Sequence, residues 1–227
     1  MKKIIFTLAF MTFSGAAMVA TAQEASKPAA GDIAVELNFA PFSGAPFTLE
    51  GLNARYFISD KLAARVNLDL SINSGKNVTP SSTGDFTDKA SVVDFGLAPG
   101  IEYHFGNWNR VSLYGGAQLG ISMRSASFNS VRPDVTYKIT GATSDTGENR
   151  KYFGFGIEAF TGIDVYVYRN IYVGAEFGLG FNTLKFGTYK EELKASGSTT
   201  TTEHKSTSST SSLSFSATPT FRLGWRF

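Results

Sequence analysis

The chain has 227 residues, of which 42% are hydrophobic, 23 are Gly and none is Cys. The absence of Cys excludes disulfide bonds, thiolate metal sites and a lipid-modified amino-terminal cysteine. After the amino-terminal segment, no stretch has the ~20 consecutive apolar residues that a transmembrane helix needs. The 21 basic and 19 acidic residues nearly balance, so the composition gives no indication of nucleic-acid binding.

The amino terminus has the three-part layout of a secretory signal peptide. Two lysines precede an apolar core over residues 4–13, and small residues follow up to Ala22. We expect residues 1–22 to be removed during export, which leaves a polar leader over residues 23–31. An uncleaved anchor helix is the alternative, but the apolar core is short and runs into a small-residue cleavage pattern.

The last fifteen residues alternate between large apolar and small or polar side chains. The first set is Leu213, Phe215, Ala217, Pro219, Phe221, Leu223, Trp225 and Phe227. A strand of a soluble protein usually has about five or six residues, whereas a membrane-spanning strand needs ~9 to 11. Residues 213–227 are therefore long enough to cross a bilayer as a strand, with one face toward lipid.

Seven earlier segments show the same period of two, which is typical of strands between two unlike environments. They cover residues 33–40, 47–57, 62–72, 93–105, 111–122, 153–167 and 171–182. Short turns near residues 59, 108 and 169 alternate with longer polar loops near residues 43, 80, 137 and 200. Tight periplasmic turns alternating with longer outer loops are typical of transmembrane barrels. A soluble sandwich or a lipocalin-like barrel would also fit the strand spacing alone.

The polar face of these strands favours the membrane alternative. It consists mainly of Gly, Ala and Ser with isolated Arg, Asp and Glu, whereas Lys is confined almost wholly to the leader, turns and loops. A soluble barrel would present many more long polar side chains to water. Small residues with sparse charges instead suit the inside of a narrow cylinder. We therefore predict an all-β fold, an eight-stranded antiparallel up-and-down transmembrane β-barrel over residues 32–227.

Two further features follow from this barrel. Four residues are expected near the short-turn edge as an aromatic girdle: Tyr103, Trp108, Tyr168 and Trp225. Pro99 and Pro219 each remove a hydrogen-bond donor from a ladder that has no edges, so we expect a local bulge at each.

The carboxy terminus carries a family resemblance. With the signal peptide and eight alternating strands, the ending Phe221-Arg222-Leu223-Gly224-Trp225-Arg226-Phe227 resembles that of the small eight-stranded outer-membrane barrels of Gram-negative bacteria, of the outer-membrane protein A and X kind. The turn sequence from Tyr56 to Leu62 resembles one in the broader outer-membrane β-barrel domain family. These resemblances identify an architecture rather than an activity.

The resemblance implies a location and partners. In that class, a terminal Phe with aromatic or apolar residues at alternate positions before it is the signal read by the barrel-assembly machinery. It implies this role for Phe221, Leu223, Trp225 and Phe227, a location in the cell outer membrane, and contact with outer-membrane lipid.

Several charged side chains are predicted to face the lumen. The acids are Glu36, Asp69, Asp94, Glu102, Glu158, Asp164 and Glu176, and the bases are Arg55, Arg65, Arg222 and Arg226. Because an isolated ion in a dry lumen is costly, these groups should pair or meet trapped water.

A structural network is predicted where the last strand pairs with the first, because several of these charges lie at similar distances from the short-turn ends of their strands. Arg222 should bridge Glu176 and Glu36, with Arg65 and Glu102 in the same network. The alternative is that each charge separately contacts water in the lumen. Ion conduction is not expected, because eight strands leave no continuous channel once side chains fill it.

Two histidines are the candidates for general-base catalysis at neutral pH. His104 is expected on the lumen face near a short turn, where a lipid of the outer leaflet would not reach it. His204 lies in a low-complexity Ser/Thr segment that would not hold a base in register. The two lack metal-ligand spacing, and no Gly-rich phosphate loop is present. The sequence thus predicts no enzyme activity, no metal site and no cofactor.

The leading hypothesis is a structural or surface-interaction barrel with an adhesion-like role and a lumen filled by side chains. Its long outer loops, 124–151 and 187–212, would contact envelope components, host molecules or other cells. Two alternatives are a narrow transport pathway for a small apolar solute and an enzyme that modifies outer-leaflet lipid. Residues 190–210 are expected to form a flexible surface loop whose deletion leaves assembly intact.

Overall fold

The computed structural model describes residues 28–39, 49–82, 84–108, 110–195, 197–205 and 207–227. The predicted signal peptide, most of the leader and the loop expected near residue 43 lie outside the described residues.

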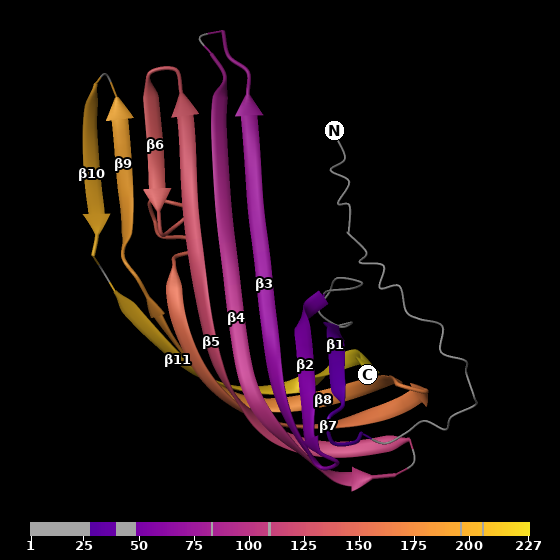
Figure 1. Cartoon of the computed structure of the whole chain (residues 1–227). Coiled ribbons are helices and arrows are strands. Elements are labelled where there is room, and N and C mark those ends of the chain that lie inside the picture. Colours follow the sequence, from indigo (N-terminus) through magenta and orange to yellow (C-terminus); the bar gives the residue numbers. More distant parts are fainter. Residues whose placement is uncertain (1–27, 40–48, 83, 109, 196, 206) are drawn as a thin grey trace.

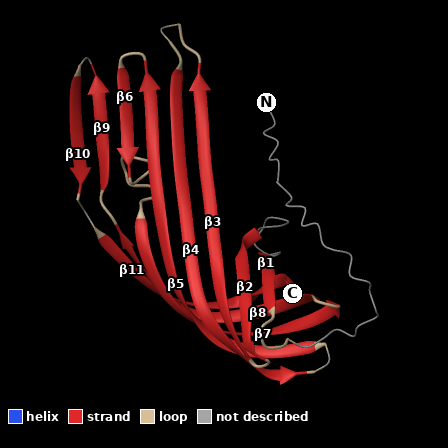
Figure 2. Cartoon of the chain, in the orientation of Figure 1, coloured by secondary structure: helices blue, strands red, loops and turns tan. Residues whose placement is uncertain are grey.

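All regular structure in this part of the chain is β-strand (Figure 2). The strands are β1 (Ile33–Phe39), β2 (Leu49–Ser59), β3 (Leu62–Thr79), β4 (Phe86–Asn107), β5 (Val111–Arg132), β6 (Val135–Thr140), β7 (Tyr152–Tyr168), β8 (Ile171–Phe186), β9 (Tyr189–Ala195), β10 (Ser198–His204) and β11 (Ser208–Arg226). Among the described residues there is no helix that is long and apolar enough to span a membrane.

Eight of these strands close into a barrel. Strands β1 to β5 pair in chain order, β5 pairs with β7, β7 with β8, and β8 with β11. The last strand also pairs antiparallel with the first, with Leu37 opposite Leu223, and this contact closes the ring. The predicted eight-stranded antiparallel barrel is confirmed, and β11 lies between the two strands that the sequence assigned to it.

Above the barrel, β5 forks. Its first part, from Val111 to Arg124, pairs with β7, and its last part, from Ser127 to Arg132, pairs with β6. Strand β6 pairs with β9, and β9 with β10. Figure 1 shows the long ends of β3, β4 and β5 rising beyond the barrel beside β6, β9 and β10. We call residues 73–79, 86–92 and 125–132, together with these three short strands, the wall.

The wall corrects the loop assignments. Loops were expected near residue 80 and over residues 124–151 and 187–212. These segments instead contain the outer ends of β3, β4 and β5, the whole of β6, β9 and β10, and the start of β11. A strand that has left the hydrocarbon needs no apolar outer face, so the period of two disappears there. The segments are rich in Thr, which still favours the extended backbone.

The two faces of the barrel are those predicted from the alternation. On β3, Leu70 and Ile72 are more than 60% exposed, whereas Ala63 and Arg65 are buried in the lumen. The pairing of β3 with β4 runs without a register shift from barrel to wall. Because side chains alternate with a period of two, the lumen side continues as the inner face of the wall and the apolar side as its outer face.

The predicted girdle residues Tyr103, Trp108, Tyr168 and Trp225 are all exposed, and each lies at or near a short turn or the carboxy-terminal end of β11. Trp225 also stacks on Phe227, with ring centroids 5.5 Å apart. These aromatic rings gather at the end of the barrel opposite the wall.

The two proline predictions have different outcomes. The pairing of β11 with β8 shifts between Ser216 and Thr220, so the expected irregularity around Pro219 is confirmed. The bulge expected at Pro99 is wrong, since Pro99 lies opposite Val66 in an unshifted ladder. Pro99 has no assigned partner on β5, although the register on that side is also unchanged. A strand residue directs its N–H toward one neighbour only, so this proline removes one bond without displacing the strand.

Shortening the outer hairpin should leave the barrel intact. Lys190 and Glu203 are directly opposite each other, so an Asn-Gly turn can replace residues 191–202. We expect the urea midpoint and the heat-dependent gel mobility of this variant to match those of the native chain. The reason is that, in the part of the chain that the structure describes, β9 and β10 pair only with β6 and each other.

Deletion of residues 190–210 is the matched comparison. It also removes the start of β11, where Ser208 and Ser209 lie opposite Phe186 and Lys185. We expect this larger deletion to lower the midpoint. A shortened hairpin that fails to reach the membrane would contradict the independence of barrel and wall.

Candidate functional site

Glycines make room for the aromatic side chains that fill the lower lumen. A Cβ atom at Gly162 would overlap the hydroxyl of Tyr114 and approach the carbonyl oxygen of Ala175 at 2.8 Å. At Gly224 it would overlap the ring of Tyr172. Both tyrosines are buried, so each large lumen side chain occupies the space that a neighbouring glycine leaves.

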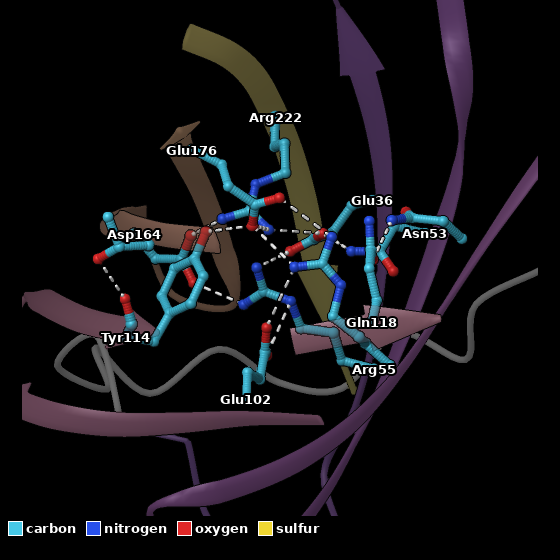
Figure 3. Close-up of polar contacts among 12 residues, drawn as sticks. Glu36, Asn53, Arg55, Glu102, Tyr114, Gln118, Asp164, Glu176 and Arg222 are labelled. Carbon is cyan, nitrogen blue, oxygen red and sulfur yellow. Dashed lines mark hydrogen bonds and ion pairs between the residues drawn. The ribbon is translucent and has the colours of Figure 1, made fainter. Parts of the chain in front are cut away.

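Arg55, on β2, lies at the centre of the lumen charges. Its guanidinium is 2.6 Å from Asp164, 2.9 Å from Glu36 and 3.1 Å from Glu102, and all four side chains are fully buried. Figure 3 shows these residues converging from strands on different sides of the barrel. The sequence placed Arg55 in the lumen but did not assign it to the predicted network.

Arg222, on β11, reaches the two acids expected from the sequence and a third. It lies 3.3 Å from Glu36, 3.3 Å from Glu176 and 2.9 Å from Asp164 (Figure 3). Asp164 was predicted to face the lumen but not to join this network. Barrel shear, the stagger between neighbouring strands, determines which residues of different strands face each other across the lumen. Counting residues from the end of each strand does not include this stagger.

Arg65 completes a continuous set of ion pairs. It contacts Glu176 at 2.7 Å and Glu102 at 3.6 Å. We call the seven side chains the lumen network: Glu36, Arg55, Arg65, Glu102, Asp164, Glu176 and Arg222. Three guanidiniums thus face four carboxylates inside a lumen that is just wide enough to be filled by side chains.

Neighbouring hydroxyl and amide groups satisfy the acids further. Tyr172 donates a hydrogen bond to Glu36 at 2.7 Å, Tyr114 to Glu176 at 3.0 Å, and Asn53 to Glu36 at 2.5 Å. The ring of Tyr114 also faces two guanidiniums, those of Arg55 at 4.9 Å and Arg222 at 5.0 Å from its centroid. Buried charges are tolerated when they are paired and hydrogen-bonded in this way.

The remaining predicted lumen charges lie apart from this network. Asp94 pairs with Arg124 at 2.7 Å nearer the wall, and Arg226 pairs with Asp32 at 3.4 Å near the short turns. Glu158 accepts a hydrogen bond from Gln118 at 2.9 Å. Asp69 lines a cavity above the network together with Glu158.

That cavity has a volume of about 570 Å³ and small or polar walls. Gly96, Gly120 and Gly156 leave the space open on three strands. A hydrogen-bonded chain runs along one side, where Asn67 donates to Gln118 at 3.0 Å and Gln118 donates to Glu158. The lumen network forms its floor through Arg65, Glu176 and Arg222.

The histidines occupy two different environments. His104 is buried in the lumen, 2.7 Å from the hydroxyl of Ser112 and 3.4 Å from Glu102. His204 was expected in a segment without fixed structure, and this is wrong. It stacks on Tyr189 with ring centroids 4.4 Å apart and lies 2.6 Å from Glu191.

His204 belongs to a cluster on the inner face of the wall. Ile139, Ala142 and Tyr189 form a buried core, and Phe128 and Tyr137 pack against it. Tyr137 donates a hydrogen bond to Glu191 at 2.9 Å. Burial, together with this hydrogen bond, raises the pKa of the Tyr137 hydroxyl to about 12. The wall therefore has its own small core.

The four carboxy-terminal residues of the predicted assembly signal lie on the outer side of β11. Phe221, Leu223, Trp225 and Phe227 are all at least 40% exposed, and they alternate with the buried residues Arg222, Gly224 and Arg226. Within the described ranges, no group of three or more His, Cys, Asp or Glu side chains is placed to hold a metal ion.

Comparison with known proteins gives one family match. The model of a family described as the putative OmpA-OmpF-like porin family matches residues 47–227, which include every strand from β2 to β11. No curated protein matches the chain. Among solved structures, the chain is similar to Ail, the attachment invasion locus protein of Yersinia pestis. The two share 13% sequence identity with a TM-score of 0.36, over 87% of this chain and 99% of that one.

Replacing Arg222 by Met should destabilise the barrel strongly. The change leaves Glu36, Asp164 and Glu176 with one buried counter-charge fewer, and loss of one partner from a buried ion pair typically costs about 3–5 kcal/mol. Urea unfolding in lipid vesicles, followed by Trp fluorescence, measures the change.

Arg132→Met is the control for Arg222→Met. Its pair with Asp88, at 3.6 Å, is well exposed, so its removal should cost less than about 1 kcal/mol. Equal midpoints for the two variants would show that the lumen charges act independently rather than as a network.

Gly162→Ala should destabilise the barrel by about 1–3 kcal/mol, because the added methyl overlaps Tyr114 and a backbone carbonyl. Gly120→Ala is the matched substitution at a lumen glycine, since its Cβ atom would meet nothing nearer than Ala98 at 4.0 Å. The same unfolding measurement compares them. If Gly120→Ala proves as costly as Gly162→Ala, side-chain packing is not what selects glycine in the lumen.

Proposed function

The chain belongs to the putative OmpA-OmpF-like porin family of outer-membrane barrels, and we propose that it binds a surface partner through its wall. The barrel lies in the outer membrane of Gram-negative bacteria, with the short turns toward the periplasm and the wall outside the cell. The proposed role is adhesion-like, and its partner is an envelope component, a host molecule or another cell.

The observation that carries this proposal is the exposed wall. From residue 69 to 79, every residue of β3 is exposed. Within the described residues, β3 pairs with β2 only through residue 68, and β10 pairs only with β9. Both lateral edges of the wall therefore present backbone N–H and C=O groups to solvent, and such edges bind extended segments of other proteins.

The side chains along these edges support a polar partner surface. Asn77 and Thr79 lie on the inner face of β3, and Thr200 and Thr202 lie on the corresponding face of β10, all exposed. Between the edges, the core around Ile139 and Tyr189 gives the sheet rigidity. A rigid platform with polar edges reduces the entropy lost when a partner binds.

The lumen network supports a structural role for the barrel itself. Arg55 and its three carboxylate partners are fully buried across the lumen. An apolar solute moving through the barrel would have to displace these paired charges. The proposed function therefore does not include solute transport. It also assigns no catalytic step, since His104 is buried among lumen side chains and His204 is held in the wall.

Two interactions of the barrel complete the proposal. Outer-membrane lipid surrounds the apolar side, and the barrel-assembly machinery would read Phe221, Leu223, Trp225 and Phe227. Their exposure on one side of the last strand leaves them accessible before the barrel closes.

Attachment of cells tests the surface role. A strain without the protein is complemented with the native chain, with the variant in which Asn-Gly replaces residues 191–202, or with Lys61→Gln at the periplasmic end. Attachment to epithelial monolayers and to cells of the same strain is counted at equal surface amounts. We expect the shortened variant to attach about tenfold less than the native chain, and Lys61→Gln to attach equally well. Equal attachment of native and shortened chains would refute the role of the wall.

A further inference from the structure

The outer face of the wall changes character in regular rows above the barrel. The highest apolar pair on β3 and β4 is Ile72 opposite Val93. The next row carries hydroxyl groups: Ser74, Ser91, Ser127 and Thr140 lie side by side on four strands. The row after that consists of Lys76, Lys89, Asn129 and Lys138 in the same order. We call these two rows the hydroxyl row and the lysine row.

The lysine row concentrates like charge. Lys76 and Lys89 are direct cross-strand partners on one face, an arrangement that is unfavourable unless a counter-charge is present. In the described part of the chain, no carboxylate lies within ion-pair distance of either ammonium group, and both residues are exposed. The described residues thus supply no counter-charge for this pair.

The rest of the outer face does not offset this charge. Lys138 lies opposite Glu192, but that carboxylate is already held by Lys194 at 2.9 Å. Lys190 pairs with Glu203 at 3.5 Å. The positive charges of Lys76, Lys89 and Lys138 therefore remain as an excess on this face.

The two rows begin directly beyond the last apolar pair of the outer face. Successive rows are two residues apart, so the lysine row is about 14 Å along the strands beyond the Ile72–Val93 pair. Lysine side chains extend further toward a membrane surface while their stems pack on the protein. The outer face is continuous with the lipid-facing side of the barrel, because the register between β3 and β4 has no shift. The excess positive charge therefore lies on the lipid-facing side, just beyond the last apolar row, where the apolar band of a membrane barrel meets the headgroups.

We propose that Lys76, Lys89 and Lys138 bind the phosphate groups of lipid headgroups in the outer leaflet, and that the hydroxyl row below them donates hydrogen bonds to the same headgroups. Phosphate oxygens accept charge-assisted hydrogen bonds from ammonium groups, and one phosphate between Lys76 and Lys89 would relieve their repulsion. The inference depends on the membrane position of the barrel and not on the surface partner proposed above.

This binding would hold the wall against the membrane by its outer face. The inner face and the two edges, through which the surface partner is proposed to bind, would remain accessible. Lipid binding and partner binding would thus use different faces of one sheet.

Lipid retention by the folded full chain tests the proposal. The native chain in a nonionic detergent is titrated with bisphosphorylated lipid A and with the same lipid after removal of both phosphates, and bound lipid is counted by native mass spectrometry. The triple variant Lys76→Gln, Lys89→Gln, Lys138→Gln is compared with the corresponding triple Arg variant. A second control is Lys61→Gln, Arg110→Gln, Arg169→Gln, which removes the same charge at the short turns, the end of the barrel opposite the wall.

We expect the native chain to prefer the phosphorylated lipid, and the triple Gln variant to bind it up to about a hundredfold more weakly, given the usual effect of a lysine near an anionic membrane surface. The triple Arg variant and the second control should bind as the native chain does. Salt at about 0.5 M should weaken binding of the phosphorylated lipid, because exposed charges are screened.

Equal binding of the native and triple Gln chains, or of the two lipids by the native chain, would overturn the proposal. So would equally effective competition by glucosamine phosphate in solution, since the site would then recognise a free phosphorylated sugar rather than a lipid. If the triple Gln variant does not fold, Lys89→Gln alone is measured, with an expected loss of about fivefold.

Discussion

The constraint on which this structure depends is the lack of water inside a membrane. A strand in hydrocarbon must pair all of its backbone N–H and C=O groups with neighbouring strands, so a sheet that crosses the membrane has to close. Here β11 provides that closure by pairing with β8 on one side and β1 on the other. Among the described residues, β3 has no partner on β2 beyond Leu68, and β10 pairs only with β9. The same sheet is therefore closed where β11 meets β1 and open along the wall, where water can satisfy the edges.

Closure with eight strands also determines what the lumen can contain. The ring is too narrow for a water-filled channel, so side chains must fill it. Glycines such as Gly162 and Gly224 accept the rings of Tyr114 and Tyr172 from neighbouring strands. In the described lumen, seven charged side chains form a mutually paired set around Arg55 and Arg222. Backbone closure and lumen pairing thus support each other, because Arg222 lies on the closing strand and Glu36 on its partner.

Alternation in the sequence was sufficient to predict the barrel, its two faces and the direction of each lumen charge. It was insufficient for Arg55 and Asp164, whose partners depend on barrel shear rather than on position along a strand. The wall was missed for another reason. Its strands lie outside lipid, so Thr199 and Thr201 on the outer face need not be apolar, and a run of Thr resembles a disordered segment. The position of His204 could not be predicted for the same reason, since its partner Tyr189 is opposite it only once β9 and β10 have paired.

The unshifted register from barrel to wall limits how such a protein can change in length. Because β3 and β4 keep one pairing throughout, odd-numbered and even-numbered residues each stay on one face along the whole of both strands. Lengthening the β3–β4 hairpin by two residues in each strand would raise the wall by one row and leave every side chain on its original face. A single-residue insertion within β3 would instead exchange the faces beyond it, turning Lys76 toward the lumen mouth and Asn77 toward the membrane. Insertions near the outer turns are therefore tolerated more readily than insertions at the level where the wall leaves the barrel.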